Sequence, residues 1–187
     1  MTIQQQTTPA TQHVSVAIAC ELSKEVASTN KPIKTLFNDT QKLLGFEISF
    51  LKESHLERYC RKHGLEAKNT EIVLMQATGR TDCHLHTKGH STFITLGNKH
   101  GFPEPGGSGL LSAEYKDGVK EYELTAEQFG VDEISVVKPM QIHAFYATEG
   151  HILTALGVVS PRIRHGESNF DVVDCDYISE NKVRVAG

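Results

Sequence analysis

From residue 71 onward the chain is divided into short apolar or alternating segments, and this pattern constrains the fold more than any other feature. Segments rich in β-branched residues are separated by Gly, Pro, Asp or Asn; they cover residues 71–77, 83–86, 91–96, 109–115, 119–124, 134–137, 141–147 and 152–160. A period of two favours strands, and the turn residues between the segments end each strand. Eight short strands joined by turns predict a β-sandwich or a small barrel of the jelly-roll kind.

The part of the chain before residue 71 follows other patterns. Residues 1–12 are rich in Gln and Thr without periodicity, and we expect them to be disordered. Alternating apolar residues over 14–20 favour a strand, with a helix that continues into 21–27 as the alternative. Residues 13–70 are otherwise expected to form a mainly helical extension, packed on a barrel and C-terminal tail formed by residues 71–187.

Two helices are predicted within this extension. Asn30 precedes a proline in the first turn and apolar residues at helical spacing, and Gly45 ends the pattern. A second, shorter helix begins at Ser54, where Ser54 and Glu57 have the spacing of a capping box, and it ends at Gly64.

Composition places the chain among medium-sized globular proteins and removes several classes of partner. Of 187 residues, 39% are hydrophobic and 22% are charged, which excludes a disordered or low-complexity chain. The net charge is -4 and no run of Lys or Arg occurs, so we expect no nucleic-acid or membrane partner. Apolar stretches are too short to cross a bilayer, and without an export signal the expected location is the cytoplasm. Four scattered cysteines fit reduced thiols; they are Cys20, Cys60, Cys83 and Cys175.

Four histidines occupy positions at which strand geometry can bring their rings together. His84 and His86 are two apart on a predicted strand, so both leave the same face with Cα atoms roughly 6.5 to 7 Å apart. Cys83 precedes them and faces the other way, as a packing residue. His90 follows a short turn, and its ring joins the others if the next strand keeps their phase. His143 stands at the start of another predicted strand. The alternative is a metal-free barrel with ordinary buried histidines.

This spacing resembles the first sequence motif of the cupin superfamily. His84 and His86 match the His-x-His pair of that motif, and Gly97 matches its closing glycine. His90 stands where most metal-binding cupins have a glutamate. The first glycine of the motif is matched by Gly79, which is one residue closer to His84 than the pattern requires.

The second cupin motif, Pro-x-Gly-x-x-His, is matched in part. Pro139 and His143 are present, and Met140 replaces the glycine. Residues 152–161, which end in Ser-Pro, resemble the closing strand of a cupin barrel. Over residues 71–161 the resemblance therefore implies a mainly β fold, namely a cupin-type double-stranded β-helix, or jelly-roll barrel, with an N-terminal helical extension.

The resemblance also implies a metal centre and a pocket beside it. One divalent transition metal (Fe, Mn, Ni, Cu or Zn) is expected, with four ligands: His84, His86, His90 and His143. Four neutral imidazoles disfavour Mg²⁺ and Ca²⁺, because those cations prefer oxygen ligands. Gln141 and Phe145 share the strand phase of His143 and are candidates for lining a substrate pocket.

The function implied by the resemblance is that of a metal-dependent enzyme acting on a small organic substrate. A dioxygenase or another oxidoreductase is the leading hypothesis, because open coordination positions can accept a chelating substrate or dioxygen. One alternative is a redox-inert isomerase, cyclase or lyase that uses Zn²⁺ or Ni²⁺. Another is a non-enzymatic cupin that binds a small molecule. No catalytic acid or base is assigned, and a homodimer is left open as the assembly state.

Overall fold

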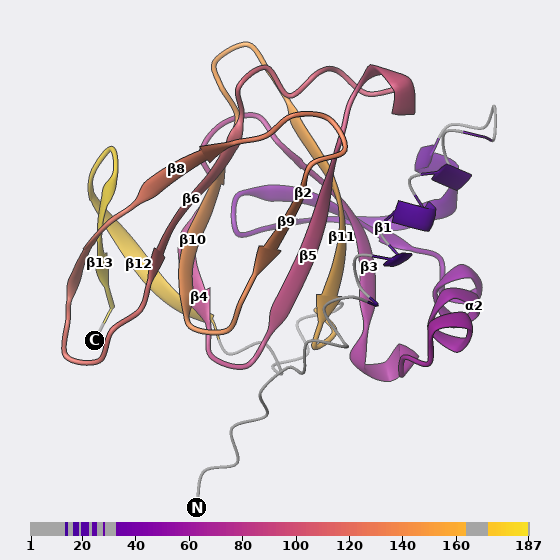
Figure 1. Ribbon diagram of the computed structural model, residues 1–187, viewed down its shortest axis with the longest axis horizontal. Coiled ribbons are helices and arrows are strands. Elements are labelled where there is room, and N and C mark those ends of the chain that lie inside the picture. Colours follow the sequence, from indigo (N-terminus) through magenta and orange to yellow (C-terminus); the bar gives the residue numbers. More distant parts are fainter. Residues whose placement is uncertain are drawn as a thin grey trace, which may run out of the picture.

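The structure is a computed structural model that describes residues 33–163 and 172–186, together with nine earlier positions. Those positions are Val14, Ala17, Ile18, Cys20, Glu21, Leu22, Lys24, Glu25 and Ser28. Most of the described chain forms two antiparallel sheets that face each other, as Figure 1 shows. The fold is therefore mainly β, as the sequence predicts.

The two sheets together contain all the strands of the described residues. One sheet has six strands in the order β1 (Phe37–Leu43), β2 (Phe46–Leu51), β3 (Glu71–Ala77), β11 (Leu153–Ser160), β5 (His90–Leu96) and β9 (Ile134–Val137). The other has seven, in the order β7 (Glu121–Glu123), β13 (Lys182–Val185), β12 (Val172–Ser179), β4 (Cys83–His86), β10 (Gln141–Tyr146), β6 (Gly109–Glu114) and β8 (Thr125–Gln128). Because strands close in sequence often lie in different sheets, the chain crosses between the sheets repeatedly, as in a jelly roll.

All eight predicted strands are present, and the structure adds five more. The additional strands are β1, β2, β8, β12 and β13. Three predictions match exactly, at residues 71–77, 83–86 and 134–137, because turn residues bound each segment closely. The strands β12 and β13 carry few buried side chains, and such exposed strands lack the alternating hydrophobicity by which the others are found.

The helix predicted from Asn30 to Gly45 is wrong, because residues 37–45 form β1 and the turn of its hairpin with β2. Leu44 and Gly45 form its two-residue turn with φ angles of 51° and 80°, and positive φ at both positions matches the twist of a hairpin. The following strand β2 has alternating buried and exposed residues. It buries Phe46 and Ile48 among the hydrophobic side chains between the two sheets. Tertiary packing therefore overrides the local helical spacing.

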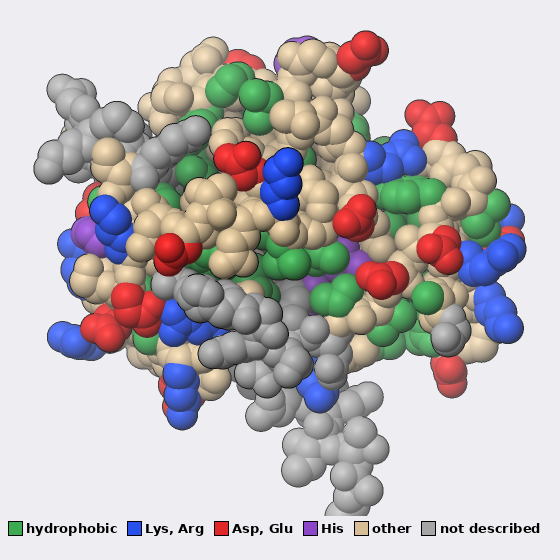
Figure 2. All heavy atoms as spheres, turned by 180° about the vertical axis from the view of Figure 1, so that it is seen from behind, with side chains coloured by type: hydrophobic (Ala, Val, Ile, Leu, Met, Phe, Trp, Pro, Cys, Tyr) green, Lys and Arg blue, Asp and Glu red, His purple; other side chains and the backbone are tan. Residues whose placement is uncertain are grey.

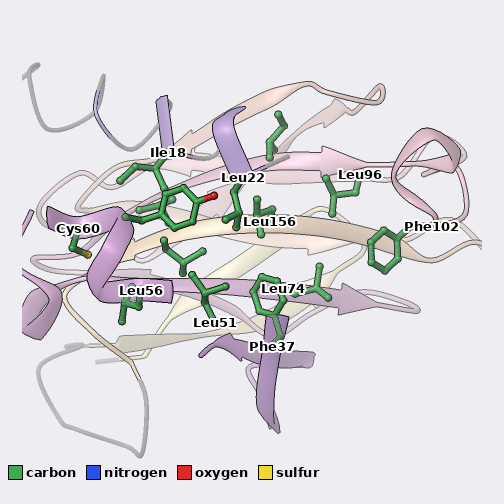
Figure 3. Close-up of a cluster of buried hydrophobic side chains, with 14 residues drawn as sticks. Ile18, Leu22, Phe37, Leu51, Leu56, Cys60, Leu74, Leu96, Phe102 and Leu156 are labelled. Atoms are coloured by element: carbon green, nitrogen blue, oxygen red, sulfur yellow. The ribbon is translucent and has the colours of Figure 1, made fainter. Parts of the chain in front are cut away.

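The strand favoured for residues 14–20 is also wrong, and the helical alternative holds at every described position there. Ile18 and Leu22 are four residues apart and both fully buried, which is the spacing of one helix face. Figure 3 shows both side chains packed with Leu156 over one face of the six-stranded sheet. The alternation in the sequence arises because small residues lie between larger apolar ones.

The expectation of a mainly helical extension over residues 13–70 thus fails for residues 37–51, which belong to the six-stranded sheet. The domain boundary near residue 70 stays a prediction. Residues 1–12, expected to be disordered, lie outside the described residues.

The second predicted helix is confirmed as α2 (Glu53–His63). It ends at Gly64, whose φ of 67° allows the left-handed turn that terminates the helix. Its N-cap is Lys52 rather than Ser54, because the Lys52 carbonyl accepts the first helical hydrogen bonds. The predicted capping box therefore does not form the N-terminus of this helix.

Helices are few elsewhere in the described residues. Three 3₁₀ helices complete the list: η1 (Ile33–Leu36), η2 (Ala67–Asn69) and η3 (Asn98–His100). Among all the helices that the structure describes, none combines the length and the apolar character that crossing a bilayer would demand.

Buried side chains form three layers that follow from strand alternation. Between the sheets lies an interior cluster that includes Phe93 and Phe145. On the outer face of the six-stranded sheet, an outer cluster packs α2 and the helical residues near position 18 against Leu74 and Leu156. A third cluster covers the outer face of the seven-stranded sheet and includes Leu85. The interior cluster positions the candidate site.

Candidate metal centre

Three of the four predicted histidines meet between the two sheets. His84 and His86 project from the same face of β4, and His143 lies on β10 directly opposite His84 in the antiparallel register. The ring centroids of His84 and His143 are 4.3 Å apart, and those of His84 and His86 are 4.7 Å apart. One nitrogen from each ring lies within 4.8 Å of the others. All three side chains are buried, with at most 4% of their surface exposed.

Backbone carbonyl groups determine which nitrogen of each ring can bind a ligand. Nδ1 of His84 lies 2.9 Å from the carbonyl oxygen of Asp82, and Nδ1 of His143 lies 2.9 Å from that of Gln141. A carbonyl oxygen only accepts hydrogen bonds, so Nδ1 must carry the proton and donate it. The Nε2 lone pair of both rings is then available to a metal, which is the usual arrangement around metal-bound imidazoles.

Burial keeps these histidines neutral. Desolvation is the largest cause of the lowered pKa of His84, and it lowers the pKa of His143 to about 3. The pKa of His86 is lowered to about 2 by desolvation first and by the two neighbouring rings second. Since only a neutral imidazole can bind a metal, the cluster is ready to bind one at neutral pH.

The donor set fits a divalent transition metal. Two nitrogens bound to one zinc ion at about 2 Å lie roughly 3 to 4 Å apart, so small ring rotations bring the three nitrogens into a common coordination sphere. No carboxylate belongs to the group within the described ranges. Three imidazoles without an oxygen ligand suit Fe, Mn, Ni, Cu or Zn and disfavour Mg²⁺ and Ca²⁺.

His90 lies elsewhere, on the outer face of the six-stranded sheet. It alternates along β5 with Ser91, and it shares its face with Ile94 and Leu96 of the outer cluster. It lines a separate cavity of about 220 Å³ beside the C-terminal end of α2, near Gly64. The structure therefore does not bring His90 to the other three histidines.

A change of strand phase at the corner explains this placement. The chain passes from the seven-stranded sheet to the six-stranded sheet between His86 and His90. Even-numbered residues of β4 face the interior, whereas odd-numbered residues of β5 do so, and Ser91 consequently lines the cavity beside the histidines. His90 was expected to face the same side as His84 and His86. This expectation does not hold, because the turn at residues 87–89 is not a continuation of the strand.

The three histidines form the polar end of a cavity of about 200 Å³. Apart from the histidines and Ser91, the cavity is lined by apolar side chains: Leu43, Leu44, Phe46, Ile48, Met75, Phe93, Phe145, Val159, Ile163 and Val172. Figure 2 shows histidine surface next to hydrophobic side chains near the middle of one face of the molecule. The cavity thus combines one polar end with apolar walls.

Of the two predicted pocket residues, one lines this cavity. Phe145 contributes to the wall and packs edge-on against Phe46 and Phe93, with ring centroids 5.4 and 5.0 Å away. Gln141 does not line it, because its Oε1 accepts a hydrogen bond from the backbone N–H of Lys138 in the preceding turn.

The walls contributed by β1, β2 and their turn were missed because a helix was predicted up to Gly45 and residues 46–51 fell within an extension expected to be mainly helical. The signal that could have found them is the alternation of Phe46 and Ile48 after the Leu-Gly turn, which is typical of a hairpin strand. Val172 on β12 was missed as well, and no strong pattern marks that strand.

Comparison with known proteins shows no family model and no curated protein that matches the chain. Solved structures do match. One is the capsular polysaccharide assembling protein CapF from Staphylococcus aureus, with 9% identity and a TM-score of 0.50 over 72% of this chain and 30% of that chain. Another is Lactobacillus farciminis oxalate decarboxylase in a formate complex, with 9% identity and a TM-score of 0.46 over 73% and 33% of the two chains.

A third similar structure is Streptomyces PAC13 with uridine, with 13% identity and a TM-score of 0.45 over 81% of this chain and 95% of that chain. The chain spans less than a third of the length of CapF. At such identities the likeness concerns the fold. Together with the two facing antiparallel sheets, the CapF match shows that the fold is cupin-like.

Proposed function

We propose that this protein is a metal-dependent enzyme that acts on a small, largely apolar organic substrate, with oxygenase chemistry as the reaction class. The observation that carries the proposal is the convergence of three neutral imidazoles on the polar end of an apolar cavity. Three histidines with positions left open for water or substrate are typical of catalytic metal sites, whereas structural sites are usually closed by a fourth protein ligand.

The ligands in this proposal are His84, His86 and His143. His90 is left out because it faces the other side of the six-stranded sheet. A bound iron or manganese ion would supply oxygen activation and Lewis acidity at its open positions. The protein itself would hold the ring nitrogens in their neutral form, orient two of them through backbone carbonyls, and keep water away from the substrate with apolar walls.

The composition of the cavity favours oxygenase chemistry over isomerase or lyase chemistry. Moving protons on a substrate requires an acid or base within hydrogen-bond reach. Among the described residues that line the cavity there is no Asp, Glu, Lys, Arg or Tyr, and Ser91 is the single hydroxyl. With the histidines occupied as ligands, these side chains can bind and shield a substrate but offer no titrating group for proton transfer.

The size and polarity of the cavity also narrow the substrate class. A volume of about 200 Å³ accommodates a small ring or a short branched chain. The apolar walls would stabilise the carbon skeleton by burial, at roughly 25 cal/mol per Å² of apolar surface removed from water. Polar atoms of the substrate would have to point toward the histidines, so a small diketone, catechol or activated alkene fits this arrangement.

The proposal is tested by metal reconstitution and oxygen consumption. Protein loaded with Fe²⁺ or Mn²⁺ should consume oxygen when it is offered small diketones, catechols or activated alkenes, whereas the zinc form should not, because zinc has no accessible redox step. His143→Ala should abolish the signal and controls for free metal in solution. His90→Ala is the matched control and should retain it.

Three other outcomes would overturn the oxygenase assignment. Conversion of a substrate by the zinc or nickel form without oxygen uptake would favour the isomerase, cyclase or lyase alternative. Thermal stabilisation by a ligand without turnover in any metal form would favour a binding protein. Equal metal content in wild type and His143→Ala after dialysis would remove the metal centre itself.

A further inference from the structure

Two cysteines lie directly opposite each other in the seven-stranded sheet. Cys83 on β4 pairs with Cys175 on β12 in the antiparallel register. Both side chains belong to the cluster on the outer face of that sheet, and both are buried, with 3% and 6% of their surface exposed. His84 follows Cys83 on β4 and faces the interior instead. The thiols therefore lie on the side of β4 that faces away from the candidate metal centre.

The geometry of this pair suits a disulfide. Directly opposed residues in antiparallel strands have Cα atoms about 4.5 to 5.5 Å apart, and disulfides span Cα separations of about 4.4 to 6.8 Å. The backbone therefore needs little or no movement to allow a bond between the two sulfurs.

The other two cysteines are placed differently. Cys60 is buried on α2 within the outer cluster of the six-stranded sheet, and Cys20 packs against the same cluster. All four cysteines are free thiols in this structure. Cys20 and Cys60 thus serve as internal controls, because they belong to another layer of the molecule.

We propose that Cys83 and Cys175 are an oxidation site, at which a peroxide forms a cross-strand disulfide that fixes β12 to β4. Hydrogen peroxide first transfers one oxygen to a thiol, which becomes a sulfenic acid, and its other oxygen leaves as water. The second thiol then attacks that sulfur, the S–S bond forms, and a second water leaves. Two thiols and one peroxide thus give one disulfide and two waters, with two electrons passing from sulfur to oxygen.

The strand β12 is the element that this bond would restrain. It pairs with β4 on one side and β13 on the other, and its residues after Cys175 are exposed. Tyr177 is held near β4 by a hydrogen bond from its hydroxyl to the Thr81 carbonyl and by the Arg80 guanidinium over its ring. Local opening of a strand with so few buried side chains would admit a small oxidant to the buried thiols.

The bond would also stiffen one wall of the cavity, because β12 contributes Val172 to its lining, opposite His86 in the register. That consequence concerns the proposed function. The disulfide itself is independent of it, because the two sulfurs lie outside the cavity and need no metal.

Mass spectrometry of the oxidised wild-type protein tests the site directly. After treatment with hydrogen peroxide and alkylation of the remaining thiols under denaturing conditions, the intact chain should carry two alkyl groups instead of four, with about 2 Da lost at the disulfide. Digestion should yield a peptide that links Cys83 to Cys175. Because the bond closes a long loop, the melting temperature should rise by roughly 5 to 10 °C. Hydrogen exchange of the β12 amides should slow, and dithiothreitol should reverse all three changes.

Variants sharpen the result. Cys175→Ser should abolish the linked peptide and the rise in melting temperature, whereas the double variant Cys20→Ser, Cys60→Ser should retain both. The proposal is overturned if wild-type protein is oxidised at Cys20 while no peptide links Cys83 to Cys175. It is equally overturned if the linked peptide forms but leaves both the melting temperature and the exchange of β12 unchanged. The peptide map of the wild type decides the matter even if a serine variant folds poorly.

Discussion

The histidine cluster between the two sheets and the ion pair at the start of β3 both bury polar side chains, but the protein accommodates them differently. At the start of β3, the fully buried Glu71 accepts a hydrogen bond of 3.0 Å from Nε of Arg162, which also pairs with Glu53. Between the sheets, imidazoles gather without a carboxylate in their group, as far as the described residues extend. A charge paired within the protein is a structural arrangement. Neutral nitrogens that converge on one point are an arrangement for a cation from outside.

The same contrast separates His86 from His90. Both are almost fully buried, with 4% and 3% of their surface exposed, and they are four residues apart. His86 faces the other two ring nitrogens in the interior, whereas His90 faces a cavity near α2. Burial alone therefore does not identify a ligand. The phase of each strand within its own sheet does.

The largest expected effect is on metal affinity. His86→Ala should weaken metal binding about 1,000-fold. Apparent binding free energies at sites with three or four ligands are about 10 to 16 kcal/mol, so each ligand contributes roughly 4 kcal/mol. His90→Ala should change the affinity less than about threefold, because its ring does not reach the centre. Competition with a chromophoric chelator measures both. Equal weakening in the two variants would restore the four-histidine ligand set and break the comparison between the faces.

The next effect concerns the stability that the Glu71–Arg162 ion pair provides. Arg162→Ala removes the guanidinium paired with the buried Glu71 carboxylate and should lower the free energy of unfolding by about 3 kcal/mol. Urea denaturation measures the change. Arg184→Ala, which removes an exposed ion pair with Glu121, is the matched control and should have no measurable effect. If both arginine variants behaved alike, the Glu71–Arg162 ion pair would not be the structural element described above.

A smaller effect should appear in the pH dependence of the metal-free protein. Unfolded histidine takes up its proton near pH 6.5, whereas burial holds the pKa of His143 at about 3, so the unfolded state binds more protons between these values. Stability therefore falls as the pH drops below 6.5, by about 2 kcal/mol down to pH 5 for this one ring. His84, His86 and His90 shift in the same direction through desolvation.

Urea unfolding of chelator-treated protein at pH 7 and pH 5 tests this dependence. His143→Gln should lose about 2 kcal/mol less than the wild type over that interval, because it lacks the ring that must stay neutral. His90→Gln should show a smaller difference, since His90 is less deeply desolvated. An identical pH dependence in wild type and His143→Gln would show that the interior ring is protonated in the native state.

The contrast between the two regions also explains how much could be predicted from the sequence. The eight strands between residues 71 and 160 were predictable, because alternation and turn residues mark strands that bury one face. The pairing of His84 and His86 on one face followed from the same alternation. The meeting of His143 with them was suggested by the cupin spacing, and the register between β10 and β4 accounts for it.

What could not be predicted depends on contacts between distant elements. The hairpin of β1 and β2 has helical spacing in its sequence, and its strand character comes from packing on β3, which local patterns do not contain. The outward position of His90 depends on how the chain turns from one sheet to the other. Periodicity gives the phase within a strand but does not carry it across such a corner.

The smallest expected effect comes from exchanging the two neighbours that face opposite sides of β5. In the double variant His90→Ser, Ser91→His, a fourth imidazole would enter the cavity beside the three histidines, where Ser91 now lies. We expect metal binding to tighten only about tenfold, about 1.4 kcal/mol, because ordering the new side chain offsets part of the gain. The fourth ligand also occupies an open coordination position, so oxygen consumption should fall even though the metal is held more tightly. Chelator competition measures the affinity, and the absorption spectrum of the Co²⁺ form reports the added ligand. The single variant His90→Ser should match the wild type in both measurements. A double variant with unchanged affinity and an unchanged Co²⁺ spectrum would mean that position 91 does not face the metal, and the assignment of interior and outer faces along β5 would have to be reversed.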